Sequence, residues 1–477
     1  MSPLIPRNDD TDPAAPPRAV DRRGFLKTVP AAVAVGLAAP ALARQAEHPA
    51  PITEQAVKAA EAIDGVHFTD AQEAMAAQGV NDHLENYETL RQVTVPLDTE
   101  PAVTFRPYPA GKQPTGPVTR NAPLQVSHPA VHVGASLDEL AFQPIVALAP
   151  LLRSRAITST DLTRMYLARL KKYGPTLQCV ITLTEELALA QAAQADREIA
   201  AGHDRGPLHG IPWGAKDLLA TKGIRTTWGA KPYEHQMIDH DATVVERLRD
   251  AGAVLVAKLS MGALAQGDVW FGGKTRNPWN VDKGSSGSSA GPGAATGAGL
   301  VGFAIGTETL GSIVSPSSTC GVVGLRPTYG RVSRYGAMAL SWTMDKLGPM
   351  SRSVEDCALV LNAIYGSDGR DTSVVDAPFD WQPDVPLASL RIGYVAKEFD
   401  EAPKFFRPGQ KAQWEKDKVL LQEALDVFRT LGARLEPIEL PDFPAQALGF
   451  CLDAEAGAAF DDLTRSRGID QMVEQGP

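Results

Sequence analysis

Residues 283–326 are rich in glycine, alanine and serine, yet large apolar residues recur through the whole stretch. Glycine lets one backbone approach another, or a bound molecule, where a Cβ atom would clash. A flexible linker shares the small residues, but it lacks apolar residues at regular intervals. We therefore expect a closely packed core segment that holds several serine hydroxyl groups. Its apolar residues are Leu300, Val301, Phe303, Ile305, Leu310, Ile313, Val314, Val322, Val323 and Leu325.

Three segments of the chain carry distinctive motifs. The first is the serine-rich loop at 285–289, and the second is the turn Gly-Thr-Glu-Thr-Leu-Gly-Ser at 306–312. The third is Gly-Ile-Pro-Trp-Gly-Ala-Lys-Asp at 210–217. Together they resemble the motifs of the amidase signature family, a group of serine hydrolases that cleave carboxamides. The resemblance covers about residues 136–477, and the motifs are highly specific when they are taken together.

The serine-rich loop aligns with the family motif in two ways, on Ser285-Ser286 or on Ser288-Ser289. Ser288 precedes Ser312 by 24 residues, which is the family's spacing, whereas alignment on Ser285 needs an insertion. With Ser288 chosen, the resemblance implies Ser312 as nucleophile, Ser288 as proton relay and Lys216 as terminal base. In the family, the residue that matches Ser288 has a cis peptide bond. We expect Ser285 and Ser286 to be structural.

The base imposes a condition on its surroundings, because a lysine accepts a proton only when it is neutral. Burial of Lys216 would lower its pKa, whereas pairing with the adjacent Asp217 would raise it. Successive side chains on a strand point to opposite faces, so we expect Asp217 to face away from Lys216.

The turn that precedes the nucleophile is the natural oxyanion hole, built from the backbone N–H groups of Thr309, Leu310, Gly311 and Ser312. Leu310 stands where the family usually has glycine, and we expect its side chain to narrow the acyl pocket. Ser289 is expected to support the loop by hydrogen bonding.

Other chemistries fit the sequence less well. All nine histidines lie at or before His240, so a nucleophile at Ser312 cannot be followed by a later histidine, as in α/β-hydrolases. The resemblance implies no metal and no organic cofactor. The four cysteines show no paired short spacing, which favours free thiols over disulfides or a zinc site. They are Cys179, Cys320, Cys357 and Cys451.

The bulk composition is that of a globular protein with a substantial core, since 44% of the 477 residues are hydrophobic and 21% are charged. The formal net charge of −10, without a compensating run of lysine or arginine, argues against a nucleic-acid partner.

Residues 1–43 have the pattern of a twin-arginine signal peptide. The pair Arg22-Arg23 precedes an apolar stretch at 29–42, and Ala-Leu-Ala at 41–43 fits a cleavage site. The apolar stretch is shorter than the roughly 20 residues that span a bilayer and contains two prolines, so we expect no membrane span. The pattern predicts contact with the twin-arginine export machinery and a periplasmic or secreted protein.

Residues 44–135 are expected to form an accessory region ahead of the main domain. The stretches 53–63 and 69–90 read as helices, the second with a capping box at its start. Residues 95–129 are rich in proline and show little periodicity. They form either an extended arm laid over the main domain or a linker.

The main domain, residues 136–477, alternates helical patterns with short apolar strands, which indicates an α/β sheet covered on both faces. The resemblance implies a mixed central sheet, here with an N-terminal helical extension. One helix is expected to follow Ser159 and Thr160 as possible caps. Further helices are expected at 184–201, 241–251 and 410–431, and strands at 212–218, 253–257, 390–395 and 435–440.

The sequence thus predicts an exported hydrolase that cleaves a small-molecule amide. The family also contains the glutaminase subunit of a tRNA-dependent amidotransferase, which stays open as an alternative function. The family's domain normally continues well beyond residues 454–468, so we expect its last strands and covering helices to be missing. A catalytically impaired enzyme or a non-enzymatic binding protein is therefore a further alternative. A homodimer also stays open.

Overall fold

The computed structural model describes residues 51–95, 108, 111–131, 133–134, 136–401 and 410–473. The expected signal peptide at 1–43 lies outside the described residues. Within the described part, no helix is both long and apolar enough to cross a membrane. The four cysteines are free thiols, as predicted, and Cys179, Cys320 and Cys357 are buried.

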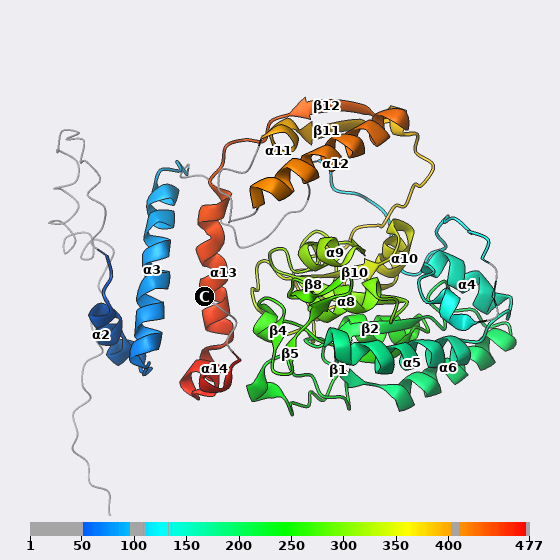
Figure 1. Ribbon diagram of the computed structural model, residues 1–477, viewed down its shortest axis with the longest axis horizontal. Coiled ribbons are helices and arrows are strands. Elements are labelled where there is room, and N and C mark those ends of the chain that lie inside the picture. The colour runs from blue at the N-terminus through cyan, green and yellow to red at the C-terminus, as the bar shows by residue number, and fades with distance from the viewer. Residues whose placement is uncertain are drawn as a thin grey trace, which may run out of the picture.

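Among the described residues, six strands form a mixed sheet inside the main body of the molecule (Figure 1). They are β1 (Val180–Leu183), β2 (Pro212–Lys216), β3 (Val254–Leu259), β8 (Phe303–Glu308), β9 (Val323–Gly324) and β10 (Lys346–Ser351). The order in space is β1-β3-β2-β8-β10-β9. β2 runs parallel to β3 and β8, whereas β1 and β10 run antiparallel to their neighbours. The motif strand β2 therefore lies in the interior of the sheet.

Apolar cores cover both faces of this sheet, because successive residues of its strands pack on opposite sides. In β8, Phe303 and Ile305 join one core and Ala304 joins the other. Helices α4, α7 and α10 contribute to the first core, α6 and α8 to the second, and α5 to both. The expected α/β fold is confirmed. These helices are α4 (Ile145–Arg153), α5 (Ser159–Leu177), α6 (Glu185–Ala200), α7 (Thr243–Asp250), α8 (Ala290–Gly297) and α10 (Val354–Ile364).

The start of α5 differs from the sequence prediction. Thr158 caps the helix, and its side-chain oxygen accepts a hydrogen bond from the Asp161 amide. The expected caps, Ser159 and Thr160, lie inside the first turn. The Ser159 hydroxyl instead donates to the Gly210 carbonyl at 2.8 Å, so a tertiary partner takes the side chain that the local pattern assigned to capping.

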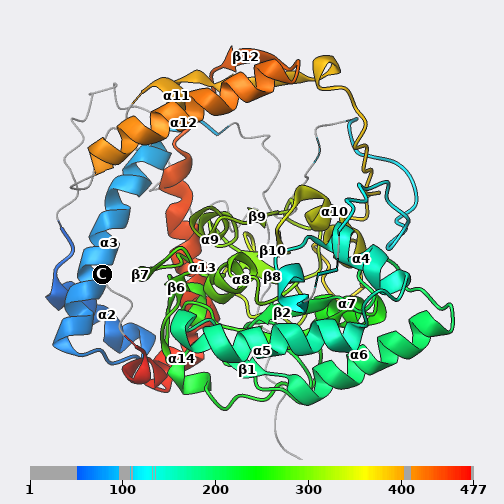
Figure 2. The ribbon, with the colours of Figure 1, turned by 45° about the vertical axis from the view of Figure 1, so that its right-hand side comes forward.

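The N-terminal helices α2 (Glu54–Asp64) and α3 (Asp70–Arg91) form as predicted, with the capping box at Thr69. They lie beside the C-terminal helix α13 (Phe450–Ala459), to one side of the sheet (Figures 1 and 2). The Tyr87 ring lies 4.9 Å from the Phe450 ring, and His83 Nε2 lies 2.9 Å from an Asp453 oxygen. Helices α3 and α13, which are far apart in the sequence, are therefore packed together.

The segment 111–131 lies over the main domain, as expected for an extended arm and not for a linker. Val118, Leu124, Val126 and Val131 pack against the first core. The earlier residues 96–107 of the same proline-rich stretch lie outside the described part.

A separate parallel pair of strands, β11 (Arg391–Val395) and β12 (Arg434–Ile438), lies apart from the main sheet and is joined by α12 (Gln410–Thr430) (Figure 1). Both strands lie within two residues of the bounds that the sequence predicts. The remaining elements are short: β4 (Val269–Trp270), β5 (Gly273–Lys274), β6 (Arg276–Asn277), β7 (Asn280–Gly284), α9 (Val314–Cys320), α11 (Ala396–Asp400) and α14 (Asp461–Arg465).

Candidate active site

Lys216 ends strand β2, and its side chain is fully buried. Its Nζ lies 2.8 Å from Ser288 Oγ and 3.1 Å from Ser289 Oγ. It also lies 2.9 Å from Thr307 Oγ1 and 3.3 Å from the Thr307 carbonyl oxygen. The buried amine thus contacts three oxygen-bearing residues.

The pKa of Lys216 is lowered from 10.5 to about 7, mainly because burial disfavours the ammonium. The negative charges of Asp345 and Glu308 act in the opposite direction. A substantial fraction of the amine is therefore neutral near pH 7, as a general base requires.

The adjacent Asp217 belongs to a different network, as strand alternation predicts. Its Oδ1 lies 3.0 Å from Lys258 Nζ, and its Oδ2 accepts hydrogen bonds from the amide and hydroxyl of Thr227. Asp217 and Lys258 are both fully buried. This carboxylate pairs with Lys258 and not with Lys216, whose amine contacts Ser288 and Ser289 instead.

The loop between β7 and α8 carries the serines, and the peptide bond between Gly287 and Ser288 is cis, as the resemblance implied. Ser289 Oγ accepts from the Thr307 amide at 3.1 Å and donates to its carbonyl at 3.0 Å, which fixes the loop against β8. The Ser289 amide donates to the Ser312 carbonyl at 3.1 Å. Ser289 therefore supports both the base and the turn that carries Ser312.

Ser285 and Ser286 point their hydroxyl groups elsewhere. Ser285 Oγ donates to the Ser286 carbonyl at 2.8 Å, and Ser286 Oγ lies 2.7 Å from Ser315 Oγ. These contacts hold the loop itself together, consistent with a structural role.

Ser312 follows β8 on the turn that leads into α9, and 9% of its surface is exposed. Within the described part of the chain, no hydrogen bond joins its hydroxyl to that of Ser288. Gly311 adopts a φ of +87°, a left-handed conformation that favours glycine. Among the described residues, the amides of Leu310, Gly311 and Ser312 have no acceptor, so they are open to a substrate oxygen.

The side chain of Leu310 does not lie where we expected it. It is 73% exposed and is absent from the lining of the neighbouring cavity, so it does not narrow that space. The turn directs this side chain towards the surface.

Three residues of the site were not singled out from the sequence. Thr307 contacts Lys216 directly, as given above. The buried Glu308 accepts from the amides of Ile313 and Val314 at 2.8 and 3.0 Å, which fixes the turn. Asp345 accepts from the Thr309 hydroxyl at 2.5 Å. Glu308 and Thr307 lie inside a quoted motif, but Asp345 had no sequence signal that links it to the turn.

A cavity of about 430 Å³ opens beside Thr307 and Thr309, next to the contacts of Lys216. Most of its other lining residues belong to the segment 334–347. Such a volume lies within the roughly 300–1,000 Å³ typical of small-molecule sites. The buried amine, the serine hydroxyls, the open amides and a cavity are therefore gathered at one end of β2 and β8.

Comparison with known proteins decides the family. The sequence model of the amidase family matches residues 161–475. The chain belongs to the amidase family. Members with solved structures include the native peptide amidase of Stenotrophomonas maltophilia. It is 33% identical, has a TM-score of 0.61, and the match covers 71% of this chain and 74% of that one. The fatty acid amide hydrolase structure, at 21% identity and a TM-score of 0.61, shows the fold alone.

Curated relatives of this amidase-family chain include proteins that bear the name of a glutamyl-tRNA(Gln) amidotransferase subunit. The protein of Methylococcus capsulatus is 40% identical over 331 residues, which is 68% of this chain and 66% of the relative. That of Roseiflexus is 40% identical over 341 residues, which is 65% of this chain and 67% of the relative. The chain spans about two thirds of the length of these relatives.

Proposed function

We propose that this amidase-family protein hydrolyses a carboxamide through an acyl-enzyme on Ser312. The observation that carries the proposal is the fully buried Lys216 amine, with a pKa of about 7, at 2.8 Å from Ser288 Oγ. A neutral amine has two hydrogens and one lone pair. It donates the hydrogens to Thr307 and Ser289, and its lone pair accepts the Ser288 hydroxyl proton.

Acylation follows from this arrangement. Ser312 Oγ attacks the amide carbon while its proton passes to Ser288 Oγ, whose own proton passes to Lys216. The open amides of the turn receive the oxyanion. Ser288 then gives a proton to the leaving nitrogen as the C–N bond breaks, and Lys216 returns its proton to Ser288. A water molecule attacks the acyl group by the same relay and releases the acid.

The proposal is tested by release of ammonia from a panel of primary amides, with the Ser312→Ala variant as control. We expect turnover by the unmodified protein and a loss of roughly 10³-fold or more in the variant, as for other triad nucleophiles. Equal turnover by both proteins would contradict the role of Ser312.

A second candidate function is that of the glutaminase subunit of an amidotransferase, because the curated relatives carry that enzyme's name at 40% identity. Glutamine is therefore included in the panel. If glutamine is the best substrate and its turnover rises when a partner subunit is added, the second function is favoured. Turnover of simple amides by the chain alone favours the first.

A further inference from the structure

The cavity beside the candidate site has one apolar half. Leu218 follows Lys216 at the end of β2, and Leu347 begins the facing part of β10. Met338 and Leu340 line the segment between them, and Trp342 stands at the rim with 48% of its surface exposed. This half offers dispersion contacts and an aromatic face to a bound group.

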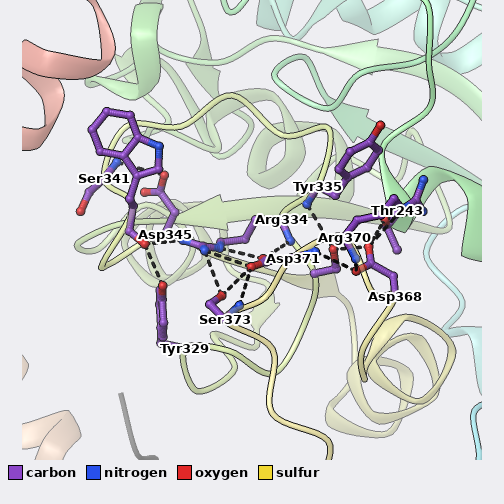
Figure 3. A network of polar contacts seen from close by, with 12 residues as sticks. Thr243, Tyr329, Arg334, Tyr335, Ser341, Asp345, Asp368, Arg370, Asp371 and Ser373 are labelled. Carbon is purple, nitrogen blue, oxygen red and sulfur yellow. Dashed lines mark hydrogen bonds and ion pairs between the residues drawn. The ribbon is translucent and has the colours of Figure 1, made fainter. Parts of the chain in front are cut away.

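The polar half contains Arg334, whose guanidinium already donates hydrogen bonds to other groups of the protein. Arg334 Nε and Nη2 donate to the two oxygens of Asp371 at 3.0 and 3.2 Å. Its Nη2 also donates to Ser373 Oγ at 2.9 Å, and its Nη1 donates to the Trp342 carbonyl at 2.5 Å. Figure 3 shows Arg334 beside Asp371 and Ser373. The pKa of Asp371 is lowered to about 2 despite its burial, because Arg334 and Ser373 donate to its carboxylate.

The other two charged residues of the lining are likewise engaged. Arg370 donates to both oxygens of Glu246 and, at 2.7 Å, to Thr243 Oγ1. Asp345 accepts from the Thr309 hydroxyl and from the amides of Leu340 and Ser341 at 2.8 and 3.0 Å. The described residues of the lining thus include two cationic and two anionic side chains, whose formal charges cancel.

These contacts leave few charged groups of the lining free to pair with a charged ligand. A carboxylate or an ammonium that binds beside the apolar half of the cavity loses hydration and needs a partner of opposite charge. Among the described residues that line the cavity, each arginine is already paired with a carboxylate, and Asp345 already accepts three hydrogen bonds. An uncharged group does not lose the hydration of a charge, and it gains dispersion contacts with the apolar half of the cavity.

We infer that this cavity selects an uncharged amide that carries an apolar or aromatic group. The inference rests on the proposed function, because it assumes that the bound amide is the one cleaved at Ser312. It narrows the substrate class, and it disfavours free glutamine, whose carboxylate and ammonium would both need unpaired partners.

Binding to the Ser312→Ala variant tests the inference without any need for turnover. Isothermal titration compares isocaproamide with succinamate, which have the same number of heavy atoms but differ by one carboxylate. Phenylacetamide and γ-aminobutyramide provide the aromatic and the cationic cases. We expect the uncharged amides to bind at least about 100-fold more tightly than either charged one. Succinamate, γ-aminobutyramide or glutamine binding as tightly as isocaproamide would overturn the inference.

A second variant is expected to bind the anionic ligand more tightly. Asp371→Asn removes the carboxylate that neutralises Arg334 while it keeps an acceptor oxygen, so the cavity acquires a positive charge. Built on Ser312→Ala, it should reduce the preference for isocaproamide over succinamate by about 10-fold or more. The matched control is Asp384→Asn, the same change at an exposed position away from the lining. An unchanged preference in a folded Asp371→Asn protein would contradict the role given to the Arg334–Asp371 pair.

Turnover by the unmodified protein distinguishes failure of the proposed function from failure of the cavity inference. If Ser312-dependent turnover occurs but favours succinamate or glutamine, the proposed function holds and the cavity inference fails. If the uncharged amides bind selectively but no amide is turned over, the cavity inference holds and the proposed function fails.

Discussion

The ammonium of Lys258 lies 3.0 Å from the carboxylate of Asp217, and both side chains are fully buried. Asp217 directly follows Lys216, the last residue of β2, yet the two side chains belong to different networks. Lys258 Nζ also donates to Thr226 Oγ1 at 2.8 Å. Lys258 therefore neutralises the buried carboxylate of Asp217. This matters for Lys216, because a close, unpaired carboxylate would raise its pKa.

Replacement of Lys258 by methionine should leave the Asp217 carboxylate buried and unpaired. We expect a loss of about 3–5 kcal/mol in the free energy of unfolding, the usual cost of breaking a buried pair on one side. The uncompensated anion should also raise the pKa of Lys216 and move the acidic limb of kcat/KM to higher pH. Urea denaturation and a pH–rate profile measure the two effects.

The double variant Lys258→Met with Asp217→Leu is the matched control, because it removes both charges. Stability should recover in large part, and the acidic limb should return towards its original position. A limb that does not move in Lys258→Met would show that Asp217 has no influence on the base.

The acidic limb of the unmodified protein follows from the lowered pKa of Lys216. The lysine is protonated and inactive below its pKa and neutral above it, so kcat/KM should rise with pH and level off above about 7. Initial rates with a neutral amide between pH 5 and 9 measure this limb. A limb near 10.5, the ordinary lysine value, would show that the burial of Lys216 does not set its basicity.

Lys216→Ala should abolish turnover at neutral pH and recover part of it as the pH rises, because hydroxide then replaces the missing base. The same profile with Lys222→Ala, an exposed lysine in the following turn, is the control. Equal activity of Lys216→Ala and the unmodified protein across pH 6–9 would remove Lys216 from the mechanism.

Glu308→Ala should loosen the turn that carries Ser312, because the amides of Ile313 and Val314 lose their acceptor. We expect kcat to fall by roughly 10²-fold, the scale of a displaced oxyanion donor. Since the Glu308 charge raises the pKa of Lys216, its loss should also shift the acidic limb to lower pH. Glu308→Gln, which keeps an oxygen, should restore most of kcat but retain the shift. A purely structural role would leave the limb unmoved in both variants.

The sequence was sufficient for the features that depend on local pattern. Strand alternation predicted that Asp217 faces away from Lys216, and the motif spacing selected Ser288, whose Oγ is the one at 2.8 Å from Lys216. The helices and strands of the sheet could be located because their apolar residues recur with clear periods.

Contacts between distant segments could not be predicted in this way. Lys258 and Asp345 meet the motif residues only after β3 and β10 take their places in the sheet, and no local pattern encodes that order. The packing of α3 on α13, through Tyr87 and Phe450, joins segments more than 300 residues apart. The cap of α5 was misassigned for a related reason, since the Ser159 hydroxyl bonds to Gly210 in another segment.

The most direct test of the proposed mechanism is to map the residue that a fluorophosphonate probe modifies, by mass spectrometry of the digested protein. We expect a single adduct, on Ser312, that is absent from Ser312→Ala and forms far more slowly in Lys216→Ala and Ser288→Ala at pH 7. An adduct on Ser288 or Ser286 while Ser312 stays unmodified would contradict the proposed mechanism.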